Sequence, residues 1–238
     1  MRFRFRLWPT LFTLPSLAVL VGLGTWQVER LHWKEALTDK LRQRSTMEAV
    51  PLPAWVDNLE AYEYRRVKVR GIYLHNKEFY LVNRSLHGNP GLNIVTLLKR
   101  SDGGGHVLVN RGWVPFDRRD PATREAGQLR GEVAVEGIVR LAKGPGLFTP
   151  ENEPHNNTWF YIDPASMTVT AGMPPLQGYY LLAGDKSVPG GYPVGHQWRV
   201  DLPNDHLEYA ITWYALALAL VVIYILHHRK PASGDANE

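Results

Sequence analysis

Two long apolar runs without a single charge lie near the two ends of the sequence, and they restrict the fold more than any other feature. The first covers residues 7–28 and the second residues 209–226. As helices that rise about 1.5 Å per residue they would reach about 33 and 27 Å, close to the roughly 30 Å hydrocarbon core of a bilayer. The sequence therefore predicts a membrane hairpin whose two helices flank one domain.

Basic residues indicate the orientation of this hairpin. Arg2, Arg4 and Arg6 precede the first run, and Arg229 and Lys230 follow the second. Because positive charge is retained on the cytoplasmic side, we expect both termini in the cytoplasm and the domain on the other side. A cleaved signal peptide is the alternative for the first run, but no small-residue cleavage site follows it. The short segment ahead of that run leaves no room for a mitochondrial presequence, which favours a bacterial cell inner membrane.

The predicted fold class is a membrane protein with two transmembrane helices flanking a mainly antiparallel β extracytoplasmic domain (α+β). Its segments are a cytoplasmic N-terminal tail (1–6), a first transmembrane helix (7–28), the extracytoplasmic domain (29–205), a second transmembrane helix (206–226) and a cytoplasmic C-terminal tail (227–238). Just after the first span we expect a helix from about Leu31 to Arg44, which ends before Pro51 and Pro53.

Alternation of apolar and charged residues with a period of two predicts the strands of the domain. The alternation is clearest at residues 66–73 and 132–141. Residues 92–99 and 106–114 flank the glycine triplet 103–105. Glycines suit a tight reversal, so we expect these two segments to pair as a hairpin. Shorter candidate strands cover residues 79–83, 159–162 and 178–182.

Composition and motifs exclude many kinds of enzyme. The sequence has no cysteine, which removes thiolate metal sites, covalent haem attachment and cysteine nucleophiles. It has no phosphate-binding loop, nucleophile elbow, zinc-protease motif or dinucleotide fingerprint. The net charge of +4 is concentrated at the tails, which indicates contact with the lipid bilayer and not with nucleic acid. We therefore expect a protein that is not an enzyme.

Six segments, spread over nearly the whole sequence, carry a resemblance to a known family. They are residues 23–30 (LGTWQVER), 64–67 (YRRV), 109–115 (VNRGWVP), 148–152 (FTPEN), 159–163 (WFYID) and 204–214 (NDHLEYAITWY). In these segments and their order the chain resembles the Surfeit locus protein 1 (Surfeit-1) family of cytochrome c oxidase assembly factors. The resemblance implies a membrane protein that receives haem a and presents it to the oxidase catalytic subunit. The implied partners are that subunit and the haem a synthesis machinery.

The resemblance also implies a haem ligand, because the family's proposed haem-ligating histidine corresponds to His206. Asp205 and Glu208 stand where the family often has asparagine and glutamine.

The residues around His206 are compatible with binding of haem iron. Asp205 and Glu208 have the spacing of a capping box, which would place His206 at the first helical position. The positive end of the helix dipole favours a neutral imidazole there, with a lone pair for iron. A flat macrocycle could lie on the helical face that continues through Tyr209, Ala210, Trp213 and Ala217. The alternative is an ordinary aromatic belt at the membrane surface.

Small residues predict that the two spans pack against each other. The pairs are Ala18 with Gly22 in the first span, and Ala215 with Ala219 in the second.

In such a hairpin Trp26, Gln27 and Arg30 would lie at about the depth of His206. Trp26 is equally well interpreted as an interface anchor, and Gln27 as a hydrogen-bonding partner of the neighbouring helix. Arg30 and Arg199 could pair with the two haem propionates or with lipid head groups.

Three further patterns are interpreted as not functional. Asn110–Trp113 ends an apolar strand, and its Gly112 would allow a bulge or a close backbone approach. We expect Arg111 and Trp113 to pack the domain onto itself or onto the membrane surface. Residues 148–152 suit a loop that caps the sheet, and His227 and His228 suit a solvated helix end.

Two rival functions remain at this point. The first is a membrane-anchored scaffold that stabilises oxidase assembly intermediates without binding haem. The second is a haem-using redox enzyme, which would need an open coordination position and a substrate pocket with acid–base residues. No such constellation is evident in the sequence.

Overall fold

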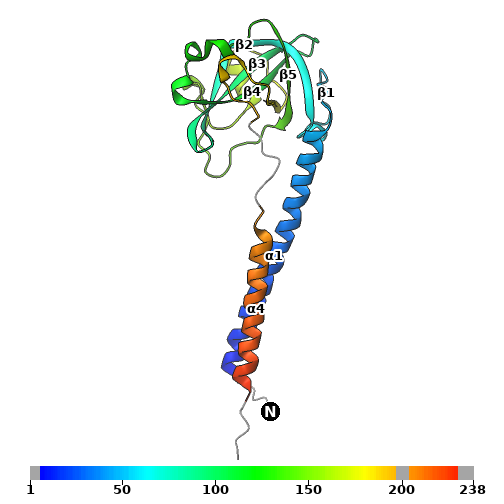
Figure 1. The fold of residues 1–238 in the computed structure, drawn as a ribbon, viewed down its shortest axis with the longest axis vertical. Helices are drawn as coiled ribbons and strands as arrows, with labels where there is room; N and C mark the ends of the chain where they lie inside the picture. Colours follow the sequence, from blue (N-terminus) through cyan, green and yellow to red (C-terminus); the bar gives the residue numbers. More distant parts are fainter. Residues whose placement is uncertain (1–5, 197–203, 230–238) are drawn as a thin grey trace, which may run out of the picture. The chain divides into compact units, whose positions relative to one another are not determined.

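The computed structural model describes residues 6–196 and 204–229 (Figure 1). The chain forms two compact units. The helical unit takes residues 1–39 and 201–238, and the β unit takes residues 40–200. Two long helices, α1 (Leu7–Thr46) and α4 (His206–His228), occur at the two ends of the chain. Two candidate transmembrane helices therefore flank a β domain, which confirms the predicted fold class.

Both long helices are long and apolar enough to cross a membrane. Many of their apolar side chains are exposed, among them Phe12, Ile211 and Leu218. Extended apolar surface of this kind calls for a lipid or protein cover, so the two helices indicate membrane anchoring. At 40 residues, α1 is about 60 Å long, roughly twice the hydrocarbon thickness. The helix predicted at residues 31–44 is accordingly the second half of α1, which runs on to Thr46.

The two helices pack against each other in antiparallel fashion, as predicted. Side-chain hydrogen bonds join them along their length: Arg6 to His227 at 3.0 Å, Thr10 to Tyr224 at 2.7 Å, Thr25 to Tyr214 at 3.1 Å and Gln27 to His206 at 2.7 Å. In a membrane such bonds contribute about 0.6 to 2 kcal/mol each. Polar contacts therefore hold a pair of otherwise apolar helices together.

The small residues predicted for this interface are the wrong ones. Gly22 has nothing within 4 Å of the position of an added Cβ, whereas a Cβ on Gly24 would lie 2.8 Å from the Tyr214 ring. On α4 the buried alanines are Ala210 and Ala217, while Ala18, Ala215 and Ala219 are exposed. A two-residue offset turns a helical position by about 200°. Gly22 and Ala215 therefore lie on nearly the opposite helix faces from the residues that pack, Gly24 and Ala217.

The β unit consists of strands joined by short helical turns. The strands are β1 (Val50–Pro51), β2 (Arg66–Leu86), β3 (Asn89–Arg100), β4 (His106–Pro115), β5 (Glu132–Leu141), β6 (Thr158–Trp159) and β7 (Tyr179–Ala183). The α-helices are α2 (Leu59–Tyr62) and α3 (Pro164–Thr170), and 3₁₀ turns cover Phe116–Arg118, Pro121–Gly127, Pro154–Asn156 and Pro189–Gly191. Asp163 caps α3 by accepting a hydrogen bond from the Ser166 amide at 3.1 Å, with Pro164 at the first helical position.

Five of the strands form a closed ring in the order β2–β3–β4–β7–β5, because β5 pairs back onto β2. Most neighbours are antiparallel, including the predicted β3–β4 hairpin. The β4–β7 pair is parallel and short, and β1 and β6 pair with β2 in parallel. The sheet is therefore mixed, and β2 pairs with four strands: β3 and β5 in the ring, and β1 and β6 outside it. Its pairing with β3 contains two register shifts.

All five ring strands contribute to one hydrophobic cluster, the barrel core. It contains Val67, Val69, Tyr73, Leu98, Val107, Val109, Val135, Val139, Tyr179 and Leu181, with Leu52 and Val56 from outside the ring. A second cluster lies beneath α3 and β6 and contains Phe79, Leu81, Val95, Leu97, Leu108, Trp159, Ile162 and Met167. Leu97 and Leu108 adjoin core residues along their strands, so the second cluster covers the opposite face of β3 and β4.

Candidate functional site

His206 lies at the start of α4 and is hydrogen-bonded to the first helix. Its Nδ1 is 2.7 Å from Oε1 of Gln27, a side chain only 9 % exposed. An amide oxygen can only accept, so Nδ1 carries the proton and Nε2 keeps its lone pair. His206 is half-buried, and its Nε2 makes no hydrogen bond within the described residues. This arrangement fixes one tautomer of the imidazole and leaves one nitrogen able to bind a metal.

Asp205 occupies the predicted N-cap position, and His206 is the first helical residue. The predicted capping box is wrong, because the Asp205 side chain makes no cap hydrogen bond. Its φ of −93° and ψ of 8° depart from the extended conformation that aims a capping side chain at the first helical amides. The orientation of the His206 ring therefore depends on its hydrogen bond to Gln27 and not on side-chain capping at the start of α4.

The residues on the helical face that continues from His206 differ in their exposure. Ala210 and Ala217 are buried and Trp213 is half-buried, whereas Tyr209 is exposed. The predicted helical face therefore has Ala210, Trp213 and Ala217 turned inward, with Tyr209 at its exposed side. Because Ala210 and Ala217 are already buried, the part of this face left to a flat apolar group is the half-buried Trp213, with Tyr209 at its margin.

The candidates on the first helix differ in their contacts. Trp26 is 53 % exposed, as expected of an interface anchor. The Arg30 guanidinium stacks over the Trp33 ring at 3.9 Å, a cation–π contact that leaves its N–H groups available at the ring edge. Arg199 lies outside the described residues.

One prediction is wrong at the other end of the helix pair, where His227 and His228 end α4. His228 is buried, stacks on Tyr224 with ring centroids 4.1 Å apart, and places Nδ1 2.8 Å from the Tyr224 carbonyl oxygen. Only His227 is exposed, and it bonds Arg6. The expectation that both histidines are solvated was wrong for His228, because the ring of Tyr224 one turn earlier covers it.

A buried ionic cluster surrounds Glu78 in the β unit. The Arg124 guanidinium lies 2.5 Å from its Oε2, Arg111 lies 3.4 Å from its Oε1, and Gln128 donates to Oε1 at 3.3 Å. Burial alone would raise the pKa of Glu78, but hydrogen bonds from His75 and Arg124 and the charges of Arg124 and Arg111 outweigh it and lower the pKa to about 2. Nothing in the sequence marks Glu78 or Arg124 as a site residue, since both occur in segments without a motif.

Arg111 and Gly112 of the Asn110–Trp113 motif have structural roles, as interpreted from the sequence. Arg111 is 4 % exposed, lies 4.8 Å over the Tyr73 ring, and also donates to the Gly127 carbonyl oxygen. It is the extra residue of a bulge between β3 and β4. The Gly112 amide donates to Asn110 Oδ1 at 3.1 Å. These contacts pack the domain onto itself.

The loop at residues 148–152 only partly matches its prediction. Asn152 organises it, since Oδ1 accepts from the Phe160 amide at 2.8 Å and from the Tyr161 amide at 3.3 Å. Phe148 is 92 % exposed and caps nothing within the described residues. The neighbouring turn explains this, because Thr149 and Gly146 bond each other and hold the Phe148 side chain outward.

These features define a class: proteins with a helix at each end that can cross a membrane, a five-stranded barrel between them, and a histidine bonded across the helix pair. One known protein family matches most of the chain. The model of the SURF1 family matches residues 15–218, and the chain belongs to that family.

Relatives named Surfeit locus protein 1 align with nearly the whole chain. That of Takifugu rubripes is 41 % identical over 217 residues, which are 85 % of this chain and 89 % of the relative. That of Homo sapiens is 42 % identical over 229 residues, 90 % of this chain and 75 % of the relative. A SURF1-like protein of Drosophila melanogaster is 38 % identical over 218 residues, 85 % and 71 % of the two chains.

Proposed function

We propose that this protein is a non-enzymatic assembly factor for haem-copper cytochrome c oxidase, which carries haem a on His206 and presents it to the catalytic subunit. Haem a is cargo in this proposal, received from the haem a synthesis machinery. Family membership supports the class of function. The observation that carries the assignment to His206 is its hydrogen bond to Gln27.

The Gln27–His206 pair suits transient binding of a porphyrin iron. By accepting from Nδ1–H, Gln27 orients the ring and makes Nε2 a better ligand, which is the usual role of a residue bonded to a metal-binding histidine. One imidazole is a weaker hold than two axial ligands, and a carrier must release its cargo. Trp213 offers a partly accessible aromatic surface on α4, next to the buried Ala210 and Ala217, with Trp26, Tyr209 and Arg30 as further contacts. Arg199 and Arg30 are proposed partners of the propionates.

The proposed location is a bacterial cell inner membrane, with both termini cytoplasmic and the β domain on the periplasmic side. Basic residues before α1 and after α4 support this orientation, since they match the bias of cytoplasmic flanks.

The first test is the absorbance of the full chain, purified in detergent from a host that makes haem a. The parent protein is expected to show a Soret band, and His206→Ala is expected to lose it at equal expression. Colourless parent protein would instead support a scaffold that holds assembly intermediates without haem. A Soret band that persists in His206→Ala would reject His206 as the ligand.

Gln27→Leu tests the orienting hydrogen bond. This variant keeps His206 but removes the partner of Nδ1, so haem affinity is expected to fall roughly 10- to 100-fold. Thr10→Val is the matched control, because it removes another interhelix hydrogen bond of 2.7 Å, to Tyr224, far along α1 from His206. Titration of the purified proteins with haem measures both. Equal losses in the two variants would mean that Gln27 acts only through helix packing.

A further inference from the structure

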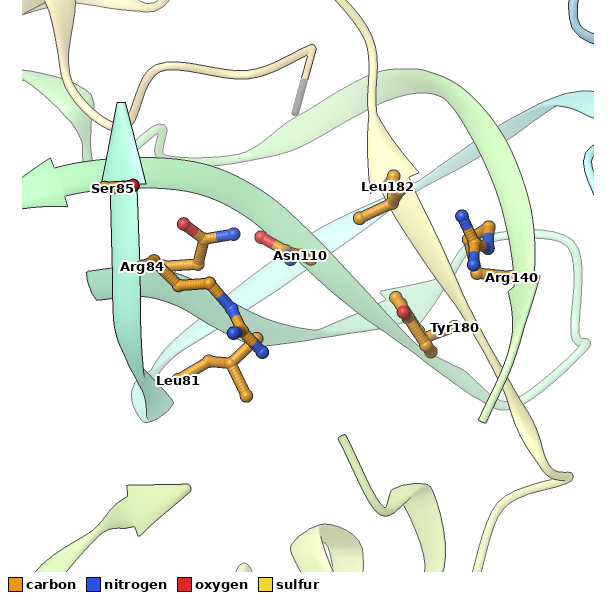
Figure 2. A pocket seen from close by; sticks show the side chains of 8 residues that line it. Leu81, Arg84, Ser85, Asn110, Arg140, Tyr180 and Leu182 are labelled. Atoms are coloured by element: carbon orange, nitrogen blue, oxygen red, sulfur yellow. The ribbon is translucent and has the colours of Figure 1, made fainter. Parts of the chain in front are cut away.

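A pocket of about 270 Å³ in the β unit brings together side chains from all five strands of the ring. Its polar lining is Arg84 and Ser85 of β2, Asn93 of β3, Asn110 of β4, Arg140 of β5 and Tyr180 of β7. Figure 2 shows Arg84, Asn110 and Tyr180 around one space, with Arg140 at its far side. The pocket uses no residue of the helical unit, so it is independent of the proposed haem site.

The pocket lies on the face of the ring that the barrel core does not use. Its residues alternate with core residues along their strands: Asn110 follows Val109, Tyr180 precedes Leu181, and Arg140 follows Val139. Half-buried arginines on this face are therefore not side chains trapped inside the core. They border a space that a ligand can enter.

Arg84 and Arg140 lack the carboxylate partners that other buried arginines of this unit have. Arg100 pairs with Asp102, and Arg111 and Arg124 pair with Glu78, but within the described residues no carboxylate lies within 4 Å of Arg84 or Arg140. Among the residues that the structure describes, Arg84 donates only to the carbonyl oxygens of Asn83 and Phe160, each at 3.2 Å.

Arg140 stacks at 4.7 Å over the Tyr64 ring, and its buried Nε has no hydrogen-bond partner in the described part of the chain. Burial lowers the pKa of the Arg84 guanidinium, with a smaller opposing effect from Tyr180. Both guanidinium groups are half-buried at the pocket, and an anion there would supply a counter-charge to them.

Asn93 is a second, independent observation that indicates a ligand in this pocket. It is only 5 % exposed and lines the pocket, yet its Oδ1 is buried without a hydrogen-bond partner among the described residues. Buried polar atoms are nearly always paired, so an orphan acceptor at a pocket wall indicates a missing donor. Asn110 differs, because its Oδ1 already accepts from the Gly112 amide and its NH₂ group is left to donate.

We propose that this pocket binds a small molecule with an oxyanion group, phosphate or carboxylate, and a hydroxyl or amine beside it. Arg84, Arg140 and the Asn110 amide hold the oxyanion, and Asn93 Oδ1 accepts from the neighbouring donor. At about 30 Å³ per water, the pocket has room for about nine waters, which suits a ligand of about ten non-hydrogen atoms. Paired guanidinium groups favour planar or tetrahedral oxyanions over halides.

Titration calorimetry on the full chain in a maltoside detergent tests this site, with inorganic phosphate, glycerol 3-phosphate and malate as probes. At least one organic probe is expected to bind saturably and more weakly as salt rises. Which probe binds decides between phosphate and carboxylate. Arg84→Gln should weaken binding at least tenfold. Arg70→Gln, which removes an exposed cation on the same strand, should change it less than twofold. Absence of saturable binding for all three probes at millimolar concentration would overturn the proposal.

Asn93→Asp gives a test that does not depend on loss of fold. The substituted carboxylate has nearly the shape of the amide and would itself pair with the arginines. It is expected to abolish probe binding and to raise the melting temperature of the ligand-free protein. A variant that binds the probes as well as the parent, or that melts at a lower temperature, would contradict an anion site here.

Discussion

Glu78→Gln is expected to lower the free energy of unfolding of the β unit by about 3 to 5 kcal/mol, the cost of removing one partner from a buried ion pair. The Glu78 carboxylate and both guanidiniums are at least 97 % buried at their side chains. A neutral amide would leave Arg111 and Arg124 close together without a counter-charge. The measurement is thermal or denaturant unfolding of the detergent-solubilised protein, followed by the circular dichroism of the sheet.

Glu136→Gln is the matched control for this substitution. Glu136 pairs with Arg66 at 2.5 Å, but both side chains are more than 40 % exposed. Exposed ion pairs contribute about 0 to 1 kcal/mol, so this variant should unfold almost like the parent. If the two variants lose similar stability, the buried cluster does not hold the domain together.

Glu78 should also give the β unit a defined acid sensitivity. Its pKa is about 2 in the folded state against an ordinary 4.5, so the folded state binds fewer protons in that range. The stabilisation is complete above about pH 4.5 and is lost as the pH falls towards 2, a total of about 3 kcal/mol. The same unfolding measurement between pH 5 and pH 2 should therefore show a smaller slope in Glu78→Gln. Parallel curves for parent and variant would exclude Glu78 as the source.

The sequence predicted most elements of the fold because their patterns are local. Uncharged runs and period-two alternation need only neighbouring residues, and both long helices and the β3–β4 hairpin were predicted from them. The predicted strand at 79–83 proved to be part of the 21-residue strand β2. Leu74–Lys77 interrupts the alternation, and the sequence cannot show that β2 continues through this stretch with a shifted register.

Closure of the ring was beyond prediction for a related reason. It depends on the parallel β4–β7 pair, which joins only Val109 with Leu181 and Asn110 with Leu182. Such a pairing between distant short segments leaves no periodic pattern in either one. The turn between β2 and β3 was not predicted either; in the structure His87 and Gly88 both have positive φ, which suits a two-residue hairpin turn.

The candidate site was predictable in its composition but not in its contacts. The sequence placed Gln27 and His206 at a similar depth, and the structure adds the bond between them. Rotation of each helix about its axis decides which small residue faces the partner, and Gly24 was missed for that reason. Several charged residues were missed because they carry no motif. Glu78, Arg84 and Arg140 lie in strands and Arg124 in a 3₁₀ turn, and only folding brings them to the buried cluster and the pocket.

Gly112→Ala is expected to destabilise the β unit by about 4 kcal/mol or more, because two independent obstacles coincide there. Gly112 has a φ of +120°, which side chains rarely adopt, and an added Cβ would lie 1.8 Å from the Val194 carbonyl oxygen. That oxygen accepts from the Trp113 amide at 2.9 Å, and the Val194 amide donates back to the Trp113 carbonyl oxygen at 2.8 Å. The segment cannot move away without breaking both bonds.

The consequence of this substitution should extend to the Glu78 cluster, because Gly112 directly follows Arg111 in the bulge. A shifted backbone would draw the Arg111 guanidinium away from Glu78, so the acid-dependent part of stability should shrink along with the melting temperature. Gly178→Ala is the control, since its Cβ would meet nothing within 4 Å and should change stability by no more than about 1 kcal/mol. A Gly112→Ala protein that melts with the parent would mean that the Trp113–Val194 bridge is not formed in the folded protein.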